Sequence, residues 1–519
     1  MNNSALSSLS AIPKKQLVAP PNQPTRHIYD VVVLGRQPGG LLAGALLAKR
    51  GLTVLQLDPL GQAPYYAKEG ALFPIGPSLT PSIKSFARLE PALFELGINL
   101  DLCRYQEAHG HALQLIRGRL RFDHTQNDAD LRNEARRCFP ENADEICSVF
   151  SHLADGAETT NAFFNAPIPF PPKGFWDRFR LRRPIRELLL STPVPEDGLP
   201  ALPSGAPTTP TARLFQNCLS PLTGFVTGFE EDNELGDTRE TAHLIRGIYG
   251  IPGGSLGVGI KLGQRMLELG SDVLGCADRS TELEEIDFTF SKLSSIRLLN
   301  SDSVIRASSC ICAMDAEDFA RLPIPEKYAS RMLRFAAPLE EEKRCFVFSL
   351  LVRKNALPCG LSSRAIVFSQ KMPELGGILI ETSQARTESS SLDGCAVLTA
   401  MIRVRKSDMD TPDKAHAIAA ALRTVLTEEL CPFLDRHILQ ETIPALDAGP
   451  FSPPMAVTYK KPPKSYLGLM GLPVCTPFRN VFLANRQVLP ALGLEGELLA
   501  GIRVADLVQR KLRKYNPLK

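Results

Sequence analysis

Near the amino end of the chain, a few residues have the types and spacing that hold a diphosphate. Gly35, Gly39 and Gly40 lie in one short turn, and Asp58 follows the first of them by 23 residues. Glycines let the backbone approach a pyrophosphate, and a helix that starts there stabilises the negative charge. A carboxylate about twenty residues later accepts from a ribose hydroxyl. The pattern predicts a dinucleotide site contacted by Gly35, Pro38, Gly39, Gly40 and Asp58.

Gln37 occupies the position where a G-x-G-x-x-G turn has its second glycine. That glycine lets the backbone come close to the diphosphate, so a glutamine side chain there either turns away or crowds the ligand. We include Gln37 among the predicted contacts. The alternative is a crossover of the same shape that binds no ligand. Gly44 and the position of Asp58 argue against that alternative.

The residues around this turn must form the elements that position it. Apart from Asp30, residues 29–34 are apolar and rich in β-branched valine, as expected of a parallel strand buried on both faces. Residues 41–50 are rich in Ala and Leu, which predicts a helix that Gly51 ends. Residues 52–57 return as a second strand. Residues 28–59 are therefore predicted to form one βαβ unit.

Composition limits the classes of protein to consider. At 519 residues, the chain is too long for one ordinary core, so two intertwined domains or more are expected. A hydrophobic content of 44% and a charged content of 22% are typical of a globular protein. The net charge of +3 implies no bulk attraction to nucleic acid, so any attraction to a membrane must be local. The sequence does not indicate the oligomeric state.

The twelve cysteines include no C-x-x-C pair. Cys310 and Cys312 alternate along a predicted strand and point to the same face, too close along one strand to form a comfortable disulfide. We interpret the cysteines as reduced thiols of a cytoplasmic protein. None of the eight histidines has ligand spacing with a cysteine, so no metal site is predicted.

Residues 1–27 are rich in Ser, Asn and Pro and lack the apolar block of a secretory signal. They are predicted to be a disordered tail; a transit peptide is the alternative, because acidic residues are absent. No apolar run approaches the roughly 20 residues that span a bilayer. The chain is therefore not expected to cross a membrane.

Residues 163–190 combine aromatic, proline and basic side chains. The single tryptophan, Trp176, leads into a segment with five arginines: Arg178, Arg180, Arg182, Arg183 and Arg186. Aromatic rings settle among lipid headgroups, where guanidinium groups meet anionic phosphates. The segment predicts a peripheral membrane contact, which would also serve a protein with a lipid substrate. The alternative is a solvated basic helix beside an ordinary buried aromatic cluster.

The rest of the chain reads as alternating regular segments and loops. Residues 59–70 are interpreted as a loop, residues 82–164 carry helical patterns, and residues 111–124 within them resemble a short hairpin. Residues 191–213 are predicted to be a Pro-rich flexible loop. Residues 344–460 alternate four apolar strands with a helix over residues 412–430.

Phe73, Gly76, Pro77, Ser78 and Leu79 resemble a segment that follows the βαβ unit in FAD enzymes of the phytoene desaturase and amine oxidase group. Those enzymes also place a glycine-arginine loop against the pyrophosphate. The corresponding stretch here, LGQAPYYAKEG, has no such loop.

Two later segments strengthen the resemblance. Residues 248–273 are similar to the family's proline-glycine-glycine turn, helix, glycine exit and strand, with Gly253 and Gly254 at the helix start and Gly270 at its end. Residues 478–512 resemble the strand, loop and helix that close the flavin site. Glycines of the family are replaced in this loop by Asn485, Gln487, Ala491 and Leu492.

The resemblance implies an α/β protein with an FAD-binding Rossmann-like domain of the glutathione reductase type and a discontinuous α+β substrate domain that contains a mixed β-sheet. The FAD-binding domain would comprise residues 28–100, 245–343 and 465–519. The substrate domain would comprise residues 101–244 and 344–464, with the sheet of residues 344–460 as the floor of an apolar pocket. FAD is the implied cofactor.

The same resemblance implies further cofactor contacts. Leu283 would touch the adenine through its backbone. The last helix would face the flavin with its amino end, where its dipole stabilises negative charge on the reduced ring. Asn485, Gly493, Leu494 and Glu495 would then contact the cofactor.

The implied activity is that of an FAD-dependent oxidoreductase that desaturates, saturates or isomerises a long apolar polyene, isoprenoid or lipid, as in carotenoid biosynthesis. No side chain stands out as an acid or a base; Glu495, Arg246 and Tyr249 are candidates by position only. The alternative, from another class, is the flavin-free prenyl-, lipid- or protein-binding scaffold of the same fold in the Rab GDP dissociation inhibitor group. Gln37, Asn485 and the missing glycine-arginine loop favour that alternative.

Overall fold

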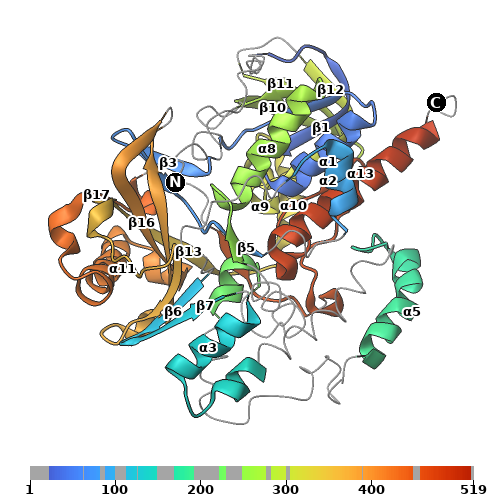
Figure 1. The fold of residues 1–519 in the computed structure, drawn as a ribbon. Coiled ribbons are helices and arrows are strands. Elements are labelled where there is room, and N and C mark those ends of the chain that lie inside the picture. The colour runs from blue at the N-terminus through green and yellow to red at the C-terminus, as the bar shows by residue number, and fades with distance from the viewer. Residues whose placement is uncertain are drawn as a thin grey trace.

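The structure is a computed structural model. It describes residues 23–61, 63–81, 88–99, 113–125, 127–148, 169–191, 221–229, 248–275, 282–299, 304–387, 390–447, 456–463 and 465–515. Two large sheets lie on opposite sides of the molecule in Figure 1, with the strands of the second sheet, mostly orange, on the left. Residues 1–22 of the expected tail, residues 1–27, and most of the Pro-rich loop, residues 192–213, fall outside the described residues. The described end of the tail is held to the protein, because the backbone N–H of Thr25 donates to Asp272 at 2.8 Å.

The first sheet is built around the strand that carries the glycine turn. β1 (Ile28–Gly35) pairs in parallel with β2 (Val54–Leu57) on one side and with β12 (Val304–Ala313) on the other. β9 (Asp272–Leu274) extends the sheet beyond β2, and β19 (Val481–Leu483) pairs in parallel with the last residues of β12. The buried, β-branched residues predicted for the first strand therefore lie in the middle of a parallel sheet, as their apolar character requires.

An antiparallel hairpin completes this sheet. β10 (Leu283–Thr289) pairs with β11 (Lys292–Leu298), which pairs with the start of β12. Cys310 and Cys312 are fully buried and belong to β12, and both are free thiols. Burial raises the pKa of both thiols, so they are protonated core residues.

Three helices pack together beside the first sheet. α1 (Pro38–Lys49) is buried along almost its whole length, and it contacts both α8 (Gly254–Glu268) and α13 (Gly493–Tyr515). Figure 1 shows these helices gathered beside β1 and β12. Because α1 is surrounded, it is rich in Ala, Gly and Leu and has no polar face.

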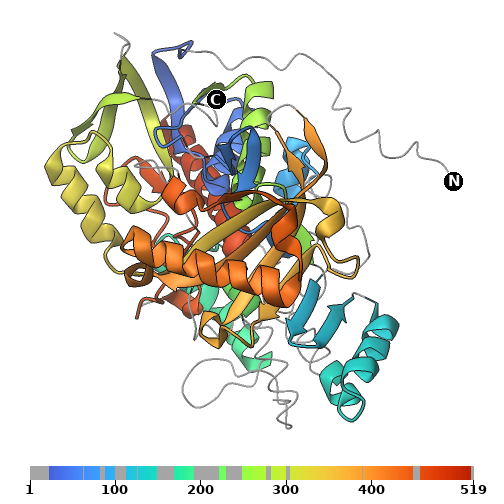
Figure 2. The ribbon, with the colours of Figure 1, turned by 90° about the vertical axis from the view of Figure 1, so that its left-hand side faces the viewer.

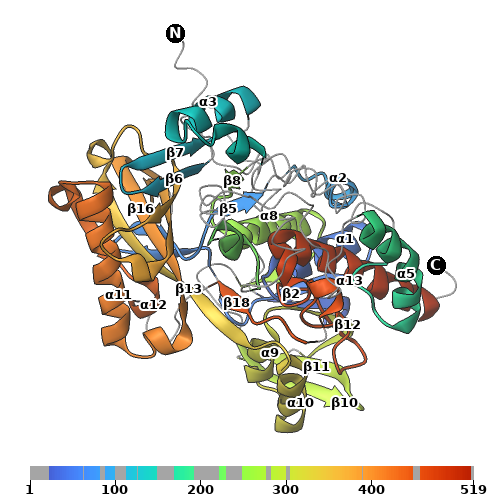
Figure 3. The ribbon, with the colours of Figure 1, turned by 90° about the horizontal axis from the view of Figure 1, so that it is seen from below.

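The second sheet has eight strands. The helix α11 (Pro412–Thr424) covers one face of it, as Figures 2 and 3 show. Apolar side chains on the face that α11 covers form a core separate from that of the first sheet. The hairpin predicted near residue 117 is present as its edge, with Gly118 in the left-handed conformation at the turn. The strands are β6 (Leu113–Arg117), β7 (Leu120–His124), β13 (Glu341–Arg353), β14 (Arg364–Phe368), β15 (Gly377–Arg386), β16 (Ser391–Arg405), β17 (Ile438–Thr442) and β18 (Val457–Tyr459).

The remaining elements are short. One prediction was wrong: residues 59–70 are not all loop, because β3 (Tyr65–Lys68) and β4 (Ala71–Pro74) form a hairpin around the glycine turn at Gly70. β5 (Leu79–Pro81) pairs with β8 (Ile248–Gly250) and links the two sheets. The other helices are α2 (Glu90–Leu96), α3 (Asp128–Cys138), α5 (Phe175–Ser191), α9 (Ala316–Arg321), α10 (Glu326–Ala336) and α12 (Pro444–Asp447).

The α/β fold class with two separate sheets is confirmed. The exact division into a cofactor domain and a substrate domain stays a prediction. Within the part of the chain that the structure describes, no helix combines the length and apolar character needed to cross a bilayer.

Because α1 and α13 are in close contact, a methyl group added at Gly39 should destabilise the fold. A Cβ at Gly39 would lie 2.4 Å from the carbonyl oxygen of Glu497 and 2.9 Å from that of Ala484. Because backbone must move to relieve this, we expect Gly39→Ala to lower the free energy of unfolding, measured in urea, by on the order of 2–3 kcal/mol.

The matched control is Gly263→Ala in α8, where a Cβ would meet nothing within 4 Å. Alanine is the better helix former, so this variant should be unchanged or more stable by up to about 1 kcal/mol. Equal stability of the two variants would contradict the described contact between α1 and α13.

Candidate functional site

Ligands of parallel α/β sheets bind beyond the carboxyl ends of the strands. In this protein, β1, β12 and β19 end side by side. The turn after β12, residues 314–317, and the loop after β19, residues 485–487, meet at that edge together with Gln37 from the turn after β1. The contacts among these three segments decide whether a dinucleotide has room there.

Gln37 joins the three segments. Its side chain is 5% exposed. Nε2 donates to Oδ1 of Asp315 at 2.8 Å, and Oε1 accepts from the backbone N–H of Arg486 at 3.1 Å. The side chain therefore lies across the edge of the sheet and makes hydrogen bonds at both of its polar atoms. Of the two outcomes considered from the sequence, it crowds the site rather than turning away.

A partly buried ion pair lies directly against Gln37, with the side chain of Asp315 11% exposed and that of Arg486 26% exposed. The guanidinium of Arg486 donates to the carboxylate of Asp315, with Nε 3.1 Å from Oδ1. Burial raises the pKa of Asp315, but the charge and hydrogen bonds of Arg486 outweigh it and hold the pKa below its usual value. The phenol of Tyr459, in β18, donates to the same carboxylate at 3.4 Å. Asp315 is thus charged and surrounded by donors from three parts of the chain.

Asn485 and Gln487 fasten the rest of the loop. Asn485 is fully buried and donates through Nδ2 to the carbonyl of Met314 at 2.6 Å. Oε1 of Gln487 accepts from the backbone N–H of Ala316 at 2.7 Å, and its Nε2 donates to Glu317 at 2.7 Å. Side chains replace glycines here and fill the space between the loop and the turn after β12.

Asp58 has the predicted position at the end of β2, but its carboxylate is already engaged. The residue is 0% exposed. Oδ1 accepts from the backbone N–H groups of Leu60 and Gly61, at 3.3 and 3.2 Å, and Oδ2 lies 3.6 Å from Nη1 of Arg36. This closed turn leaves no described side-chain surface of Asp58 for a ribose hydroxyl.

The need for glycine at each motif position follows from close contact with other parts of the protein. A Cβ at Gly35 would lie 2.3 Å from the carbonyl oxygen of Ala313, and one at Gly40 would lie 2.2 Å from the Cβ of Ala313. Gly501 of α13 packs in the same way, with Gly39 O at 2.1 Å from the added atom. These glycines bring β12 and α13 close to α1, which needs no ligand. Pro38 is buried as the first residue of α1.

The other predicted contacts are dispersed. Gly493 starts α13 at φ +47°, and a Cβ there would lie 1.9 Å from the carbonyl oxygen of Val226. The amino end of α13 therefore lies against residues 226–227. Glu495 is buried, and its charge acts on Arg88. Leu283 begins β10 opposite Leu298 and packs against the core.

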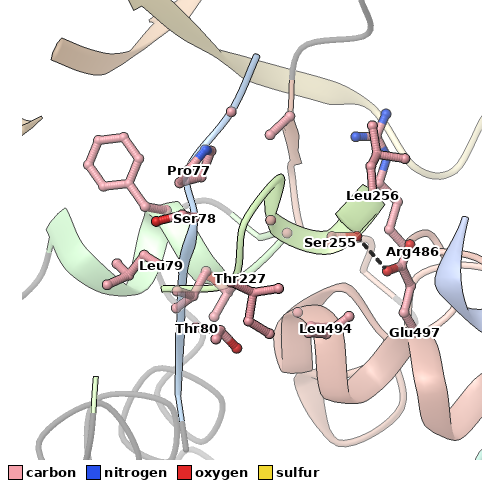
Figure 4. A pocket seen from close by; sticks show the side chains of 18 of the residues that line it. Pro77, Ser78, Leu79, Thr80, Thr227, Ser255, Leu256, Arg486, Leu494 and Glu497 are labelled. Atoms are coloured by element: carbon pink, nitrogen blue, oxygen red, sulfur yellow. Dashed lines mark hydrogen bonds between the residues drawn. The ribbon is translucent and has the colours of Figure 1, made fainter. Parts of the chain in front are cut away.

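A cavity lies next to the filled edge, between the first turn of α8, the first turn of α13 and residues 75–80 (Figure 4). The centres of water-sized atoms can occupy about 180 Å³ of it. Its lining is mostly apolar and includes Leu79, Phe225, Leu256, Val457 and Leu494. Gln37 and Arg486 form one wall, but Gly35, Asp58 and Leu283 do not line it.

The polar groups of the cavity are few and paired. Ser255 Oγ donates to Oε2 of Glu497 at 3.1 Å, the contact drawn in Figure 4. Ser78 donates from its N–H and Oγ to Glu381 of β15, at 3.0 and 2.9 Å, which attaches this wall to the second sheet. Burial raises the pKa of Glu497 to about 7, although Arg486 opposes the shift. Glu497 thus changes charge near neutral pH.

FAD does not fit the residues as they lie. The cavity is partly open to solvent, and the space between its walls admits a ring or part of a chain. The path from the cavity toward Asp58 is occupied by Gln37, Asp315 and Arg486. FAD binding therefore stays a prediction that requires these side chains to move.

Sequence reasoning missed Arg486, Asp315 and Glu497. Arg486 stands between two positions where glycines were expected, and Asp315 follows the predicted strand that carries Cys310 and Cys312. No local sequence signal pairs Arg486 with Asp315, because the two residues lie 171 positions apart. Among the positional candidates, Tyr249 pairs with Thr80 in the β5–β8 ladder and does not line the cavity, and Arg246 lies outside the described residues.

Solved structures share this fold across nearly the whole chain. A putrescine oxidase redesigned for cofactor binding has a TM-score of 0.55 at 16% identity, over 93% of this chain and 99% of that one. Cyclohexylamine oxidase from Brevibacterium oxydans IH-35A has a TM-score of 0.51 at 14% identity, over 93% and 99%. Rab GDI from Plasmodium falciparum has a TM-score of 0.50 at 10% identity, over 92% and 97%.

The fold is therefore that of FAD-dependent amine oxidases, and it also occurs in a Rab GDI. No protein-family model and no curated protein sequence matches the chain. Identities this low establish the fold alone, and the residues of the site must decide the function.

The raised pKa of Glu497 predicts how stability depends on pH. A carboxyl group whose folded-state pKa exceeds its usual 4.5 favours the native state at low pH, and this contribution is lost as pH rises through about 7. Glutamine stays neutral and can still accept from Ser255. We expect Glu497→Gln to gain stability over the native chain between about pH 5 and about pH 8, by on the order of 2–3 kcal/mol.

Thermal unfolding of both proteins across this pH range measures the difference. The control, Glu374→Gln, removes an exposed carboxylate and should change the stability little at any pH. If the Glu497→Gln variant instead became less stable relative to the native chain as pH rises, the fold would favour the ionised carboxylate, which contradicts the prediction.

Proposed function

We propose that this protein is a flavin-free binding protein of the amine oxidase fold, which holds an apolar prenyl or lipid group in the cavity between α8 and α13. The observation that carries the proposal is the side chain of Gln37, buried and hydrogen-bonded across the edge of the sheet where a diphosphate would lie. A scaffold of this kind binds without redox chemistry.

The energetics favour the closed edge. A diphosphate would have to displace Gln37 from two hydrogen bonds and draw Arg486 away from Asp315. Separating the pair would leave the charge of the nearly buried Asp315 without its main partner. The freed carboxylate of Asp315 would then face the negative phosphates. Binding of FAD would have to offset both effects.

The lining of the cavity supports an apolar ligand with a small polar end. Leu79, Phe225 and Leu494 offer apolar contact, and the polar atoms of Ser255 and Glu497 lie together at one side. Ligand sites commonly combine apolar walls with a few polar groups that fix orientation. An isoprenoid or acyl group that carries a hydroxyl has matching chemistry.

The second candidate is an FAD-dependent oxidoreductase of polyenes, isoprenoids or lipids. The specific observation in its favour is the position of Asp58 at the carboxyl end of β2, together with a cavity at the amino ends of α8 and α13, where the resemblance places the flavin ring. This function requires an alternative arrangement of Gln37 and Arg486.

One purified preparation separates the two candidates. We expect the protein to be colourless, to release no flavin on heating and to yield an apolar molecule on organic extraction, identified by mass spectrometry. Visible flavin absorbance with a stoichiometric release of FAD would instead establish the second candidate and remove the first.

The cavity itself can be tested by filling it. Leu256 lies in the first turn of α8 and lines the cavity, so Leu256→Trp should weaken binding of Nile red by about tenfold or more, measured by fluorescence titration. The control is Leu333→Trp, at a leucine that is 48% exposed on α10. Equal loss in both variants, or no loss in either, would show that the dye binds elsewhere.

A further inference from the structure

The outer face of the helix α5 carries exposed aromatic and basic side chains. These side chains belong neither to the cavity nor to the filled edge of the first sheet. Figures 1 and 3 show α5 at the periphery of the molecule, beside α13. Its first turns carry Phe175, Trp176 and Phe179, which are 67%, 73% and 51% exposed. The alternative considered from the sequence, an ordinary buried aromatic cluster, does not hold for these rings.

The inner side of α5 is firmly attached to the protein. Leu181 is fully buried in the main core, and Ile185 packs against the same core. Asp177 forms an ion pair with Arg503 of α13, whose Nε also donates to the carbonyl of Pro171 at 3.1 Å. The exposed rings are therefore displayed by an anchored helix and not by a loose end of the chain.

The outward residues share one face by helical geometry. At 100° per residue, Phe175, Phe179, Arg182 and Arg186 fall on one stripe, and Trp176 and Arg183 flank it. Leu181 and Ile185 fall roughly 130° and 90° around the helix from the centre of that stripe, on the side that packs against the core. The helix thus has an aromatic patch at its amino end, followed along the same face by guanidinium groups.

The three rings form a compact apolar group. Phe175 and Trp176 have centroids 5.5 Å apart at 77°, and Trp176 and Phe179 have centroids 6.4 Å apart at 79°. The guanidinium of Arg182 lies 5.3 Å from the Phe179 ring. Edge-to-face packing leaves no parallel ring platforms of the kind on which nucleic acid bases stack.

The charge of the segment is unbalanced. Residues 173–191 contain six basic residues, Lys173 and five arginines, and two acidic residues, Glu187 and Asp177, of which Asp177 is paired with Arg503. The segment is more positive than the whole chain, whose net charge is +3. The end of α13 adds Arg510 and Arg513, both exposed, and Lys511, whose charge interacts with that of Lys173.

We propose that the outer face of α5 docks on a lipid surface that contains anionic headgroups. The rings Phe175, Trp176 and Phe179 enter the headgroup region, and the arginines that follow them bind the phosphates. Exposed aromatic side chains lose contact with water on docking, which compensates for the small size of the patch. The anchoring of Asp177 and Leu181 fixes the helix parallel to that surface.

The single tryptophan makes the test direct. With the full chain and vesicles of phosphatidylcholine plus phosphatidylglycerol, we expect the emission of Trp176 to shift to shorter wavelength and the protein to co-sediment with the vesicles. Vesicles of phosphatidylcholine alone, or added salt, should weaken both signals because the attraction is partly electrostatic. Unchanged emission together with no co-sedimentation overturns the proposal.

Two variants locate the contact. Phe175→Ser with Phe179→Ser, and Arg180→Ser with Arg182→Ser and Arg183→Ser, should each reduce co-sedimentation by tenfold or more, since each arginine near an anionic surface contributes about fivefold. These side chains are exposed, so circular dichroism should show an unchanged fold.

The matched controls remove side chains of the same types elsewhere. Phe94→Ser with Phe433→Ser changes two phenylalanines that are 86% and 78% exposed, and Arg132→Ser with Arg136→Ser and Arg353→Ser changes exposed arginines. Both controls should bind vesicles as the native chain does. Equal loss in the controls, or binding to a polyanion such as RNA without binding to vesicles, overturns the assignment to a lipid surface.

Discussion

The partly buried ion pair between Asp315 and Arg486 is the constraint on which the rest of the site depends. Removing two charges from water is costly, and a buried pair is tolerated only when further hydrogen bonds satisfy it. Gln37 and Tyr459 supply those bonds, and Asn485 and Gln487 hold the two loops at the required distance. One charge pair therefore engages four further side chains, from the turn after β1, from β18 and from the loop after β19, in closing the edge of the first sheet.

The same edge shows that packing alone accounts for the glycines of the motif. The glycines at 35, 39 and 40 look like a phosphate motif, yet each one is required by the packing of α1 against β12 and α13. Packing requirements preserve such residues whether or not a dinucleotide is bound. The middle glycine, which serves only the ligand, is the one replaced, by Gln37. The fold is that of FAD-dependent oxidases, and the site argues for a different use of it.

Much of the fold follows from the sequence because local patterns carry it. The apolar run of β1, the Ala- and Leu-rich α1, the glycine at the end of α8 and the late helix α13 each have a signal within a few residues. The hairpin of β3 and β4 was missed, since its turn residues, Glu69 and Gly70, were read as part of a longer loop.

The site was less accessible to prediction. Gln37 and Asn485 were recognised as departures from the motif, but their partners are separated by up to 449 residues along the chain. No local pattern reveals that Arg486 finds Asp315, or that Ser255 finds Glu497. Such contacts depend on the docking of α13 on α1 and α8, which only the three-dimensional structure provides.

A crystal structure of the protein grown with excess FAD tests this account most directly. The account predicts that the electron density at the carboxyl ends of β1 and β12 shows Gln37 bonded to Asp315 and Arg486, as described here. Density for a diphosphate between Gln37 and Arg486, with the ion pair separated, would contradict it.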